Sequence, residues 1–314
     1  MARNIRSNFN NKIPLIATAS VITATVGSLL IEFLPHSIYL EKYKKLFHLQ
    51  KYGDPVLLTK KIENLYNEVL NDLNIVDKPK NLYRPFPCIG FNVCQAGLNT
   101  NKFGSVIGLP VNYAYEDRSS VDVLQLRLGY KQEKLNVYHP AASSLVDSLL
   151  LSDKAKKFGI AREIMMNQQN LQLYRCMETP SMILATAFCC EYARIQLARS
   201  VSLTLKFSVY GIITLVGYGI WFQIRDGLNT YYEKLVDKNL AELNLDYVEG
   251  GKEFYEKQLQ KNIALRALLG DRGVKEYNKD GDEIITIRRK RTPLTERKQF
   301  FIDFILSQKQ QEAV

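Results

Sequence analysis

The segment Arg162-Glu-Ile-Met-Met166 is the part of this chain that comes nearest in form to a catalytic motif. In the motif HExxH, two neutral imidazoles one helical turn apart hold Zn²⁺, and the glutamate activates a bound water. Here Arg162 and Met166 occupy the two ligand positions. A guanidinium repels the metal, and a thioether is a poor ligand for Zn²⁺. We therefore expect no metal here, and we expect Glu163 to pair with a neighbouring base instead of acting as a catalyst.

The rest of the sequence offers no self-sufficient catalytic site. It has no GxxxxGK[ST] phosphate loop, no GxSxG elbow and no GxGxxG fingerprint after a strand. Its three histidines are His36, His48 and His139, too few for most histidine-based metal sites and triads. His139 precedes Pro140 in an expected turn, which favours a structural role. The sequence predicts a protein that is not an enzyme and has no cofactor.

The order of elements around Arg162-Met166 resembles that of the membrane-embedded zinc peptidases of the heat-shock and CAAX-prenyl type. In those enzymes a strand leads to the HExxH helix, two transmembrane segments often follow, and a later helix supplies a third ligand in ExxxD. This chain has a strand-like run at 105–109, apolar stretches within 180–224, and then Glu233-Lys-Leu-Val-Asp237. The resemblance implies an inactive zincin-like domain, with an active membrane metalloprotease as the disfavoured alternative. Its degenerate positions are Arg162, Glu163, Met166, Glu233 and Asp237.

The five cysteines form no metal-binding or disulfide pattern. They are odd in number and show no CxxC spacing, which argues against a zinc ribbon or a disulfide scaffold. Cys88 and Cys94 are six residues apart and are able to share a strand face. A redox or copper role for this pair is the alternative to small core residues, which is the favoured interpretation.

Two uncharged stretches are long enough to cross a bilayer. A transmembrane helix is expected over 13–34, where 19 consecutive residues carry no charge. The flank 1–12 before it is basic and has no acid, which is typical of a mitochondrial targeting segment or a positive-inside flank. A cleaved secretory signal is the competing interpretation. A second helix is expected over 206–225, with 18 uncharged residues and Trp221 as an interface anchor.

A third span over 180–198 is less clear from the sequence. Thr179-Pro180 has the form of a helix start, and an apolar run follows it. Glu191 and Arg194 interrupt that run, but they lie three apart and are able to pair on a helix. The segment is therefore either the first half of a helical hairpin or an amphipathic helix on the membrane surface.

The remaining segments predict an α+β membrane protein, mostly helical, with a small β-sheet. For the soluble domain 36–179 the apolar spacing predicts helices over 60–75 and 152–168. Its short strands are expected at 91–96, 105–109 and 124–128.

The C-terminal region 226–314 is expected to be helical with one β-hairpin. A helix over 229–243 should be followed by a break at Gly250-Gly251 and a second helix over 252–269. Asp280-Gly281 is expected to turn the chain into a β-like run at 283–289.

The basic excess does not identify a nucleic-acid-binding protein. The 314 residues include 42 Lys and Arg against 32 Asp and Glu, and 46% hydrophobic residues are enough for a substantial core. About half of the excess flanks the apolar segments, and the rest is diluted along the soluble parts. The charge therefore fits a membrane surface better than a nucleic-acid-binding face.

The chain also resembles the transmembrane protein 177 family of animal mitochondria over nearly its whole length. The blocks that carry the resemblance occur in the order of the family, and they are Val106–Pro110, Leu151–Glu163, Gly250–Lys257 and Asn262–Gly270. The resemblance implies a multi-pass protein of the mitochondrial inner membrane that acts in cytochrome c oxidase assembly. It also implies as partners the newly made subunit II, its membrane chaperone and the copper metallochaperones.

A chaperone-like mechanism follows from these two resemblances. We expect the soluble domain to bind a segment of subunit II or of its chaperone beside a strand edge, without hydrolysing it. A general inner-membrane scaffold is the alternative, and a transporter is disfavoured because three spans supply too little pore. If 180–225 forms a full hairpin, Arg194, Arg199 and Lys206 lie on the matrix side with the N-terminus, and 225–314 returns to the side of 36–179.

Overall fold

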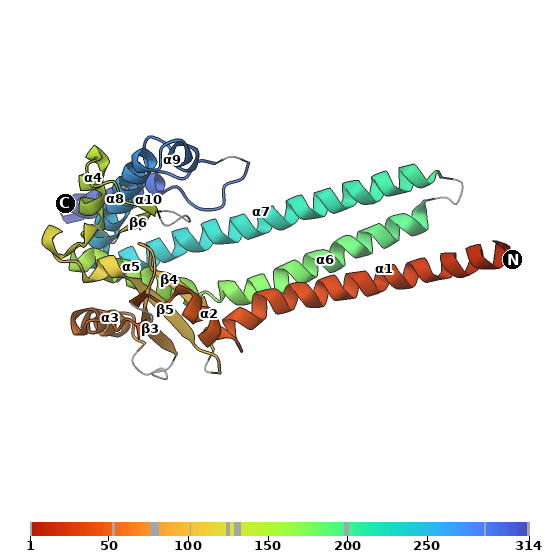
Figure 1. Cartoon of the computed structure of the whole chain (residues 1–314), viewed down its shortest axis with the longest axis horizontal. Coiled ribbons are helices and arrows are strands. Elements are labelled where there is room, and N and C mark those ends of the chain that lie inside the picture. Colours follow the sequence, from red (N-terminus) through yellow and green to blue (C-terminus); the bar gives the residue numbers. More distant parts are fainter. Residues whose placement is uncertain are drawn as a thin grey trace.

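The computed structural model consists of a head of helices and a small sheet, carried on three long helices that form a stalk (Figure 1). The structure describes residues 2–51, 54–75, 82–100, 102–123, 126–128, 133–197, 201–285 and 287–312. The stalk helices are α1 (Ala2–Phe33), α6 (Leu171–Gln196) and α7 (Leu203–Leu243). The expected mostly helical fold with a small sheet is confirmed.

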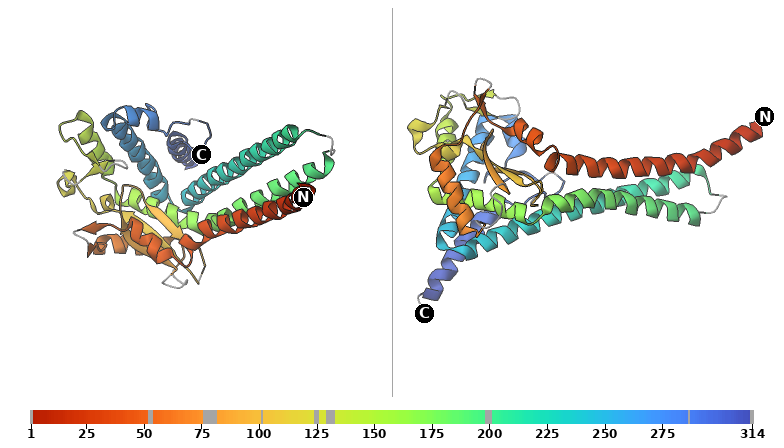
Figure 2. Two further views of the ribbon diagram at one scale, coloured as in Figure 1. Left: turned by 45° about the vertical axis from the view of Figure 1, so that its right-hand side comes forward. Right: turned by 90° about the horizontal axis from the view of Figure 1, so that it is seen from below.

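In the stalk, α6 packs against both α1 and α7. The N-terminal end of α1, the C-terminal end of α6 and the N-terminal end of α7 all lie at the end of the stalk far from the head (Figure 2). Among the described residues, α1 and α7 are the two helices long and apolar enough to cross a membrane. The helix α1 covers the expected span 13–34 except for its last residue, and α7 contains the expected span 206–225. Both helices expose large apolar side chains such as Ile22 and Leu215.

The helix over the expected third span begins earlier than predicted. Asn170, in a left-handed conformation, precedes the first residue of α6, so Pro180 lies inside the helix and is buried. Proline is favoured at the first turn by local preference, but here the packing of α6 against α1 overrides that preference. Glu191 and Arg194 pair as expected, with Arg194 Nε 2.8 Å from Glu191 Oε2. Residue 198, the end of the expected span, lies outside the described residues.

The main sheet has three strands, β3 (Tyr83–Cys88), β4 (Cys94–Gly97) and β5 (Ser105–Pro110), in the order β3-β5-β4. The central strand β5 is fully buried and runs parallel to β3 and antiparallel to β4. Two of these strands overlap the expected runs 91–96 and 105–109. The strand β3 was missed because Pro85 and Pro87 argue against a strand, but β3 is an edge strand, where proline is tolerated.

Four short strands form two further ladders outside this sheet. They are β1 (Gln50–Lys51) with β2 (Asp54–Pro55), and β6 (Arg127–Leu128) with β7 (Glu133–Lys134). The strand expected at 124–128 is found only at its end, because positions 124 and 125 lie outside the described residues.

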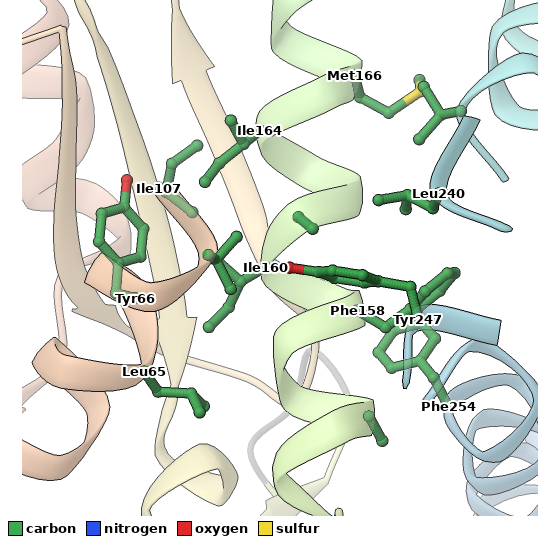
Figure 3. Packing of buried hydrophobic residues seen from close by; sticks show 14 of the residues in the cluster. Leu65, Tyr66, Ile107, Phe158, Ile160, Ile164, Met166, Leu240, Tyr247 and Phe254 are labelled. Carbon is green, nitrogen blue, oxygen red and sulfur yellow. The ribbon is translucent and has the colours of Figure 1, made fainter. Parts of the chain in front are cut away.

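The helix α5 (Asp153–Gln168) runs through the centre of the head. Ser152 caps it, with the Oγ accepting a hydrogen bond from the amide of Ala155. On one side Ile160 and Ile164 face the sheet, and on the other Phe158 faces α8 (Figure 3). The remaining helices surround this layer, and they are α2 (Leu40–Phe47), α3 (Lys60–Asp72), α4 (Pro140–Leu149), α8 (Leu245–Leu268), α9 (Asp271–Glu276) and α10 (Leu294–Glu312).

The expected break at Gly250-Gly251 is wrong, because α8 continues through both glycines. A Cβ on Gly250 would lie 2.4 Å from the carbonyl oxygen of Lys154, and one on Gly251 would lie 2.8 Å from the ring of Phe158. The glycines therefore allow the backbones of α8 and α5 to approach closely. Their role depends on helix–helix packing, which local sequence preferences do not predict.

Among the described residues, the expected hairpin at 283–289 is reduced to a tight turn with a single bridge, between Tyr277 and Glu283, and position 286 lies outside those residues. Asn278 Oδ1 holds the turn by accepting from the amides of Asp280 and Asp282. The carboxylate of Asp282 then binds Thr295 at the start of α10, with 2.6 Å between Oδ2 and the hydroxyl. This contact ties the chain to α10 instead of allowing it to continue along a partner strand.

The close approach of α8 to α5 generates a test by glycine substitution. Gly250→Ala should lower the unfolding midpoint of the detergent-solubilised protein, because the clash outweighs the gain of about 1 kcal/mol in helix propensity. Gly227→Ala in α7, where a Cβ meets nothing within 4 Å, is the matched control and should leave the midpoint unchanged or raise it. Equal midpoints for the two variants would contradict this account.

Candidate functional site

Arg162 of α5 and Glu233 of α7 meet at the centre of the head. Arg162 Nη1 lies 2.7 Å from Glu163 Oε1, and Nη2 lies 3.7 Å from Glu233 Oε1. The other oxygen of Glu233 accepts a hydrogen bond of 2.8 Å from the amide of Thr292. The expectation that Glu163 pairs with a neighbouring base is confirmed, and the base is Arg162 itself.

A second arginine, Arg297 of α10, completes this network. It forms a bidentate pair with Asp237, at 2.6 Å from Nε and 2.7 Å from Nη2. Its Nη1 lies 3.6 Å from Glu233 Oε1, so that oxygen lies between two guanidinium groups. The hydroxyl of Tyr255 donates to Asp237 at 2.8 Å, and Arg297 lies over the Tyr255 ring. We call these residues, Arg162, Glu163, Glu233, Asp237, Tyr255 and Arg297, the ion-pair network.

The network is buried, and burial decides its protonation. Asp237 and Arg297 are each 3% exposed, and Glu233 is 5% exposed. Burial raises the pKa of Tyr255 well above its usual value, so the phenol stays protonated and donates to Asp237. Burial opposes the charge on Arg297, but the neighbouring acidic groups outweigh it and its pKa is raised. The site therefore holds a set of fixed, mutually compensated charges.

The zincin-like positions are brought together only in part. Arg162, Glu163 and Glu233 are in contact, whereas Asp237 is paired with Arg297. Met166 is buried one turn further along α5. No local pattern in the sequence points to Tyr255 or Arg297, because their shared partner Asp237 lies 18 and 60 residues away in the chain. Among the described residues, no three His, Cys, Asp or Glu side chains are placed to hold a metal ion.

A cavity of about 950 Å³ lies beside the network. Its walls come from β4, from α5, from the head-proximal part of α7, from α8, and from the chain between the 278–282 turn and α10. Arg162, Glu163 and Glu233 line it on one side, and residues 91–97 line it on another. We call this space the β4 groove.

The strand β4 presents an open edge to this groove. The amide of Leu98 donates to the carbonyl of Gly104 directly opposite, so this is a hydrogen-bonded pair. In an antiparallel ladder, hydrogen-bonded pairs alternate with pairs that are not hydrogen-bonded. Gln95 and Gly97 belong to the second kind of pair, so their amides and carbonyls point away from β5. The amide of Gly97 donates to His36 Nδ1, and its carbonyl accepts from the side-chain amide of Asn167. The amide and carbonyl of Gln95 have no partner in the part of the chain that the structure describes, so they are available to a ligand in the β4 groove.

Cys88 and Cys94 lie on different strands, not on one strand face. Cys88 ends β3 and Cys94 begins β4, on either side of Gly108 in β5. A Cβ on Gly108 would meet Cys94 Sγ at 2.4 Å and Cys88 Cβ at 2.8 Å, so the absence of a side chain there makes room for both thiols. Both cysteines are free thiols.

The fold and the site define a transmembrane protein with an α+β head whose central polar site consists of ion pairs. The chain belongs to the transmembrane protein 177 family, because the family model for that protein matches residues 92–304. Similar proteins include transmembrane protein 177 of Rattus norvegicus, Xenopus laevis and Homo sapiens, each 28% identical. The matches cover 76%, 82% and 81% of this chain and 75%, 84% and 81% of the relatives. No solved structure matches this one.

The burial of the Arg297–Asp237 pair predicts a large and asymmetric effect on stability. Asp237→Ala should lower the free energy of unfolding by about 3–5 kcal/mol, since it leaves a buried guanidinium without its main partner. Asp237→Leu combined with Arg297→Met should recover most of that loss. Chemical unfolding in detergent measures both.

The control for this prediction is the exposed pair of Lys238 and Glu242, at 3.7 Å on the same helix as Asp237. Lys238→Ala should change the free energy of unfolding by less than about 1 kcal/mol. The account of the ion-pair network fails if Asp237→Ala costs no more than this control.

Proposed function

We propose that this protein is an assembly factor that holds an extended segment of a client protein against β4, without cleaving it. The observation that carries the proposal is the open edge at Gln95, which faces the 950 Å³ β4 groove. An extended peptide that adds to a sheet edge gains main-chain hydrogen bonds, and the walls of the groove select its side chains. The helices α5 and α7 form those walls.

The lack of catalysis in this proposal rests on the ion-pair network. A peptidase of the zincin type needs two neutral imidazoles on the helix that here carries Arg162 and Met166. The guanidinium of Arg162 instead pairs with Glu163 and Glu233, the two carboxylates that a metal centre would use. The protein in this proposal is a pseudo-peptidase derived from a zincin-like fold. The ion-pair geometry and the order of elements along the chain support this form of the proposal.

The client in this proposal is newly made cytochrome c oxidase subunit II, in the mitochondrial inner membrane. The membership of the transmembrane protein 177 family and the acid-free basic flank 1–12 support this choice. The membrane chaperone of subunit II and the copper metallochaperones are the further partners. A general inner-membrane scaffold without a client groove and a membrane metalloprotease are the rival functions.

We propose three membrane crossings, by α1, α6 and α7, with the head on one side. The segment before α6 and the segment after α7 pack into one core through α5 and α8, so both lie on the same side of a membrane. If α7 crosses, α6 must therefore cross as well. The exposed apolar residues Leu184 and Phe188 of α6 and the mutual pairing of Glu191 and Arg194 agree with this.

This topology predicts opposite fates for tags at the two chain ends. In mitoplasts, protease should remove a C-terminal epitope and spare an N-terminal one, since the basic N-terminal flank lies in the matrix and the head in the intermembrane space. An epitope inserted between α6 and α7 should be spared too. Removal of that inserted epitope along with the C-terminal one would overturn the three-span arrangement.

The open edge of β4 predicts the effect of a proline. Gln95→Pro removes the outward amide without touching the ladder to β5, so the fold should stay intact while crosslinking to newly made subunit II is lost. Gln95→Ala keeps the amide and is the matched control, with crosslinking near the wild-type level. Normal crosslinking of the proline variant would rule out pairing at β4.

Glu163→Gln separates the proposal from a metalloprotease. The variant should support cytochrome c oxidase assembly as well as the wild type, because Glu163 is an ion-pair partner and not a base. Purified wild-type protein should carry no stoichiometric zinc. Loss of assembly in the variant together with bound zinc in the wild type would favour the metalloprotease.

A further inference from the structure

The β4 groove has more basic than acidic side chains in its walls. Five acidic residues line it, Glu32, Glu163, Asp226, Glu233 and Glu283. Eight basic residues line it, Arg162, Arg175, Arg225, Lys261, Arg288, Lys290, Arg291 and Arg297. A cavity with an excess of one charge raises the local concentration of ligands with the opposite charge. The groove therefore favours an acidic ligand.

Several of these cations are already compensated within the protein. Arg162 and Arg297 belong to the ion-pair network, Arg225 pairs with Glu32 at 2.6 Å, and Arg288 lies 3.6 Å from Asp226. Lys261 of α8 differs from them. Its Nζ contacts two neutral amide oxygens, those of Asn92 at 2.5 Å and of Gln258. No carboxylate forms an ion pair with it in the part of the chain that the structure describes.

The buried ammonium of Lys261 lowers the stability of the fold when no ligand is bound. The residue is only 5% exposed, and burial lowers its pKa to about 7, with Glu283 as the acidic group that partly opposes the shift. A buried charge without a counter-ion destabilises the folded state. Residues that cost stability in a cavity commonly serve a ligand. An anionic group on a bound segment would supply the missing counter-charge.

The position of Lys261 relates it to the open edge of β4. Asn92, which accepts from Nζ, lies two residues before the first residue of β4 and three before Gln95. Three residues of strand span about 10 Å. A segment that pairs with the backbone of Gln95 therefore passes Lys261 about three residues further along, and an acidic side chain there reaches the ammonium.

We propose that the β4 groove selects acidic extended segments, and that Lys261 is the residue that determines this selectivity. The inference rests on the proposed client groove and names the chemical class of the segment. The client sequence that binds carries an Asp or Glu about three residues from the position that pairs with Gln95. Hydrogen bonds to β4 hold the backbone, and the ion pair to Lys261 selects the side chain.

The test measures binding of two fluorescent eight-residue peptides to the full-length protein in neutral detergent. One peptide alternates Glu with Val, and the other has Gln in place of each Glu. The wild type should bind the Glu peptide at least tenfold more tightly. Lys261→Met should abolish this preference while raising the unfolding midpoint, because it removes a buried charge. Lys261→Gln is a second variant with the same expected loss of preference.

Lys252→Met is the matched control, since Lys252 is exposed on the same helix and lies outside the groove walls. It removes the same charge and should keep the preference. Equal binding of the two peptides by the wild type, or a preference retained by both Lys261 variants, overturns the acidic selectivity but leaves the client groove standing. Binding of neither peptide overturns both proposals. Loss of the preference when an anionic phospholipid is added to the detergent would assign the cations to lipid headgroups instead.

Discussion

The close packing of α8 against α5 at Gly250 and Gly251 holds the head together. The two helices come from opposite sides of the α6–α7 hairpin, and their backbones approach as closely as a missing side chain allows. This contact closes one core from two distant segments. It also fixes the end of α7 beside α5, which brings Glu233 to Arg162. The arrangement of both the stalk and the central site follows from it.

The ion-pair network shows how a head of this form is held together around charged groups. Arg162 and Arg297 share one oxygen of Glu233, and Asp237 is satisfied by Arg297 and Tyr255. Buried charges are tolerated only when geometry and hydrogen bonding compensate each of them. The residues of the network come from four helices, α5, α7, α8 and α10, and Arg162 Nε is buried without a hydrogen-bond partner among the described residues. The network therefore joins these helices of the head to one another.

The β4 groove contrasts with the ion-pair network, because some of its polar groups lack a strand partner or a counter-charge among the described residues. The backbone of Gln95 faces the cavity without a strand beside it, and Lys261 is buried with amide partners only. If stability alone mattered, an apolar residue at position 261 and a covered strand edge at Gln95 would be favoured. The joint presence of an open edge and an uncompensated cation is what gives the groove its proposed role as a binding site for an acidic strand.

Composition and short-range spacing were enough to predict several features of this protein. These are the apolar runs in α1 and α7, the helices α3 and α5, the pairing of Glu191 with Arg194, and the pairing of Glu163 with a neighbouring base. The uninterrupted course of α8, the proline-containing strand β3 and the partners of Asp237 became clear only from the folded structure. These features depend on contacts between residues far apart in the chain, and such contacts override the local preferences of glycine, proline and charged side chains.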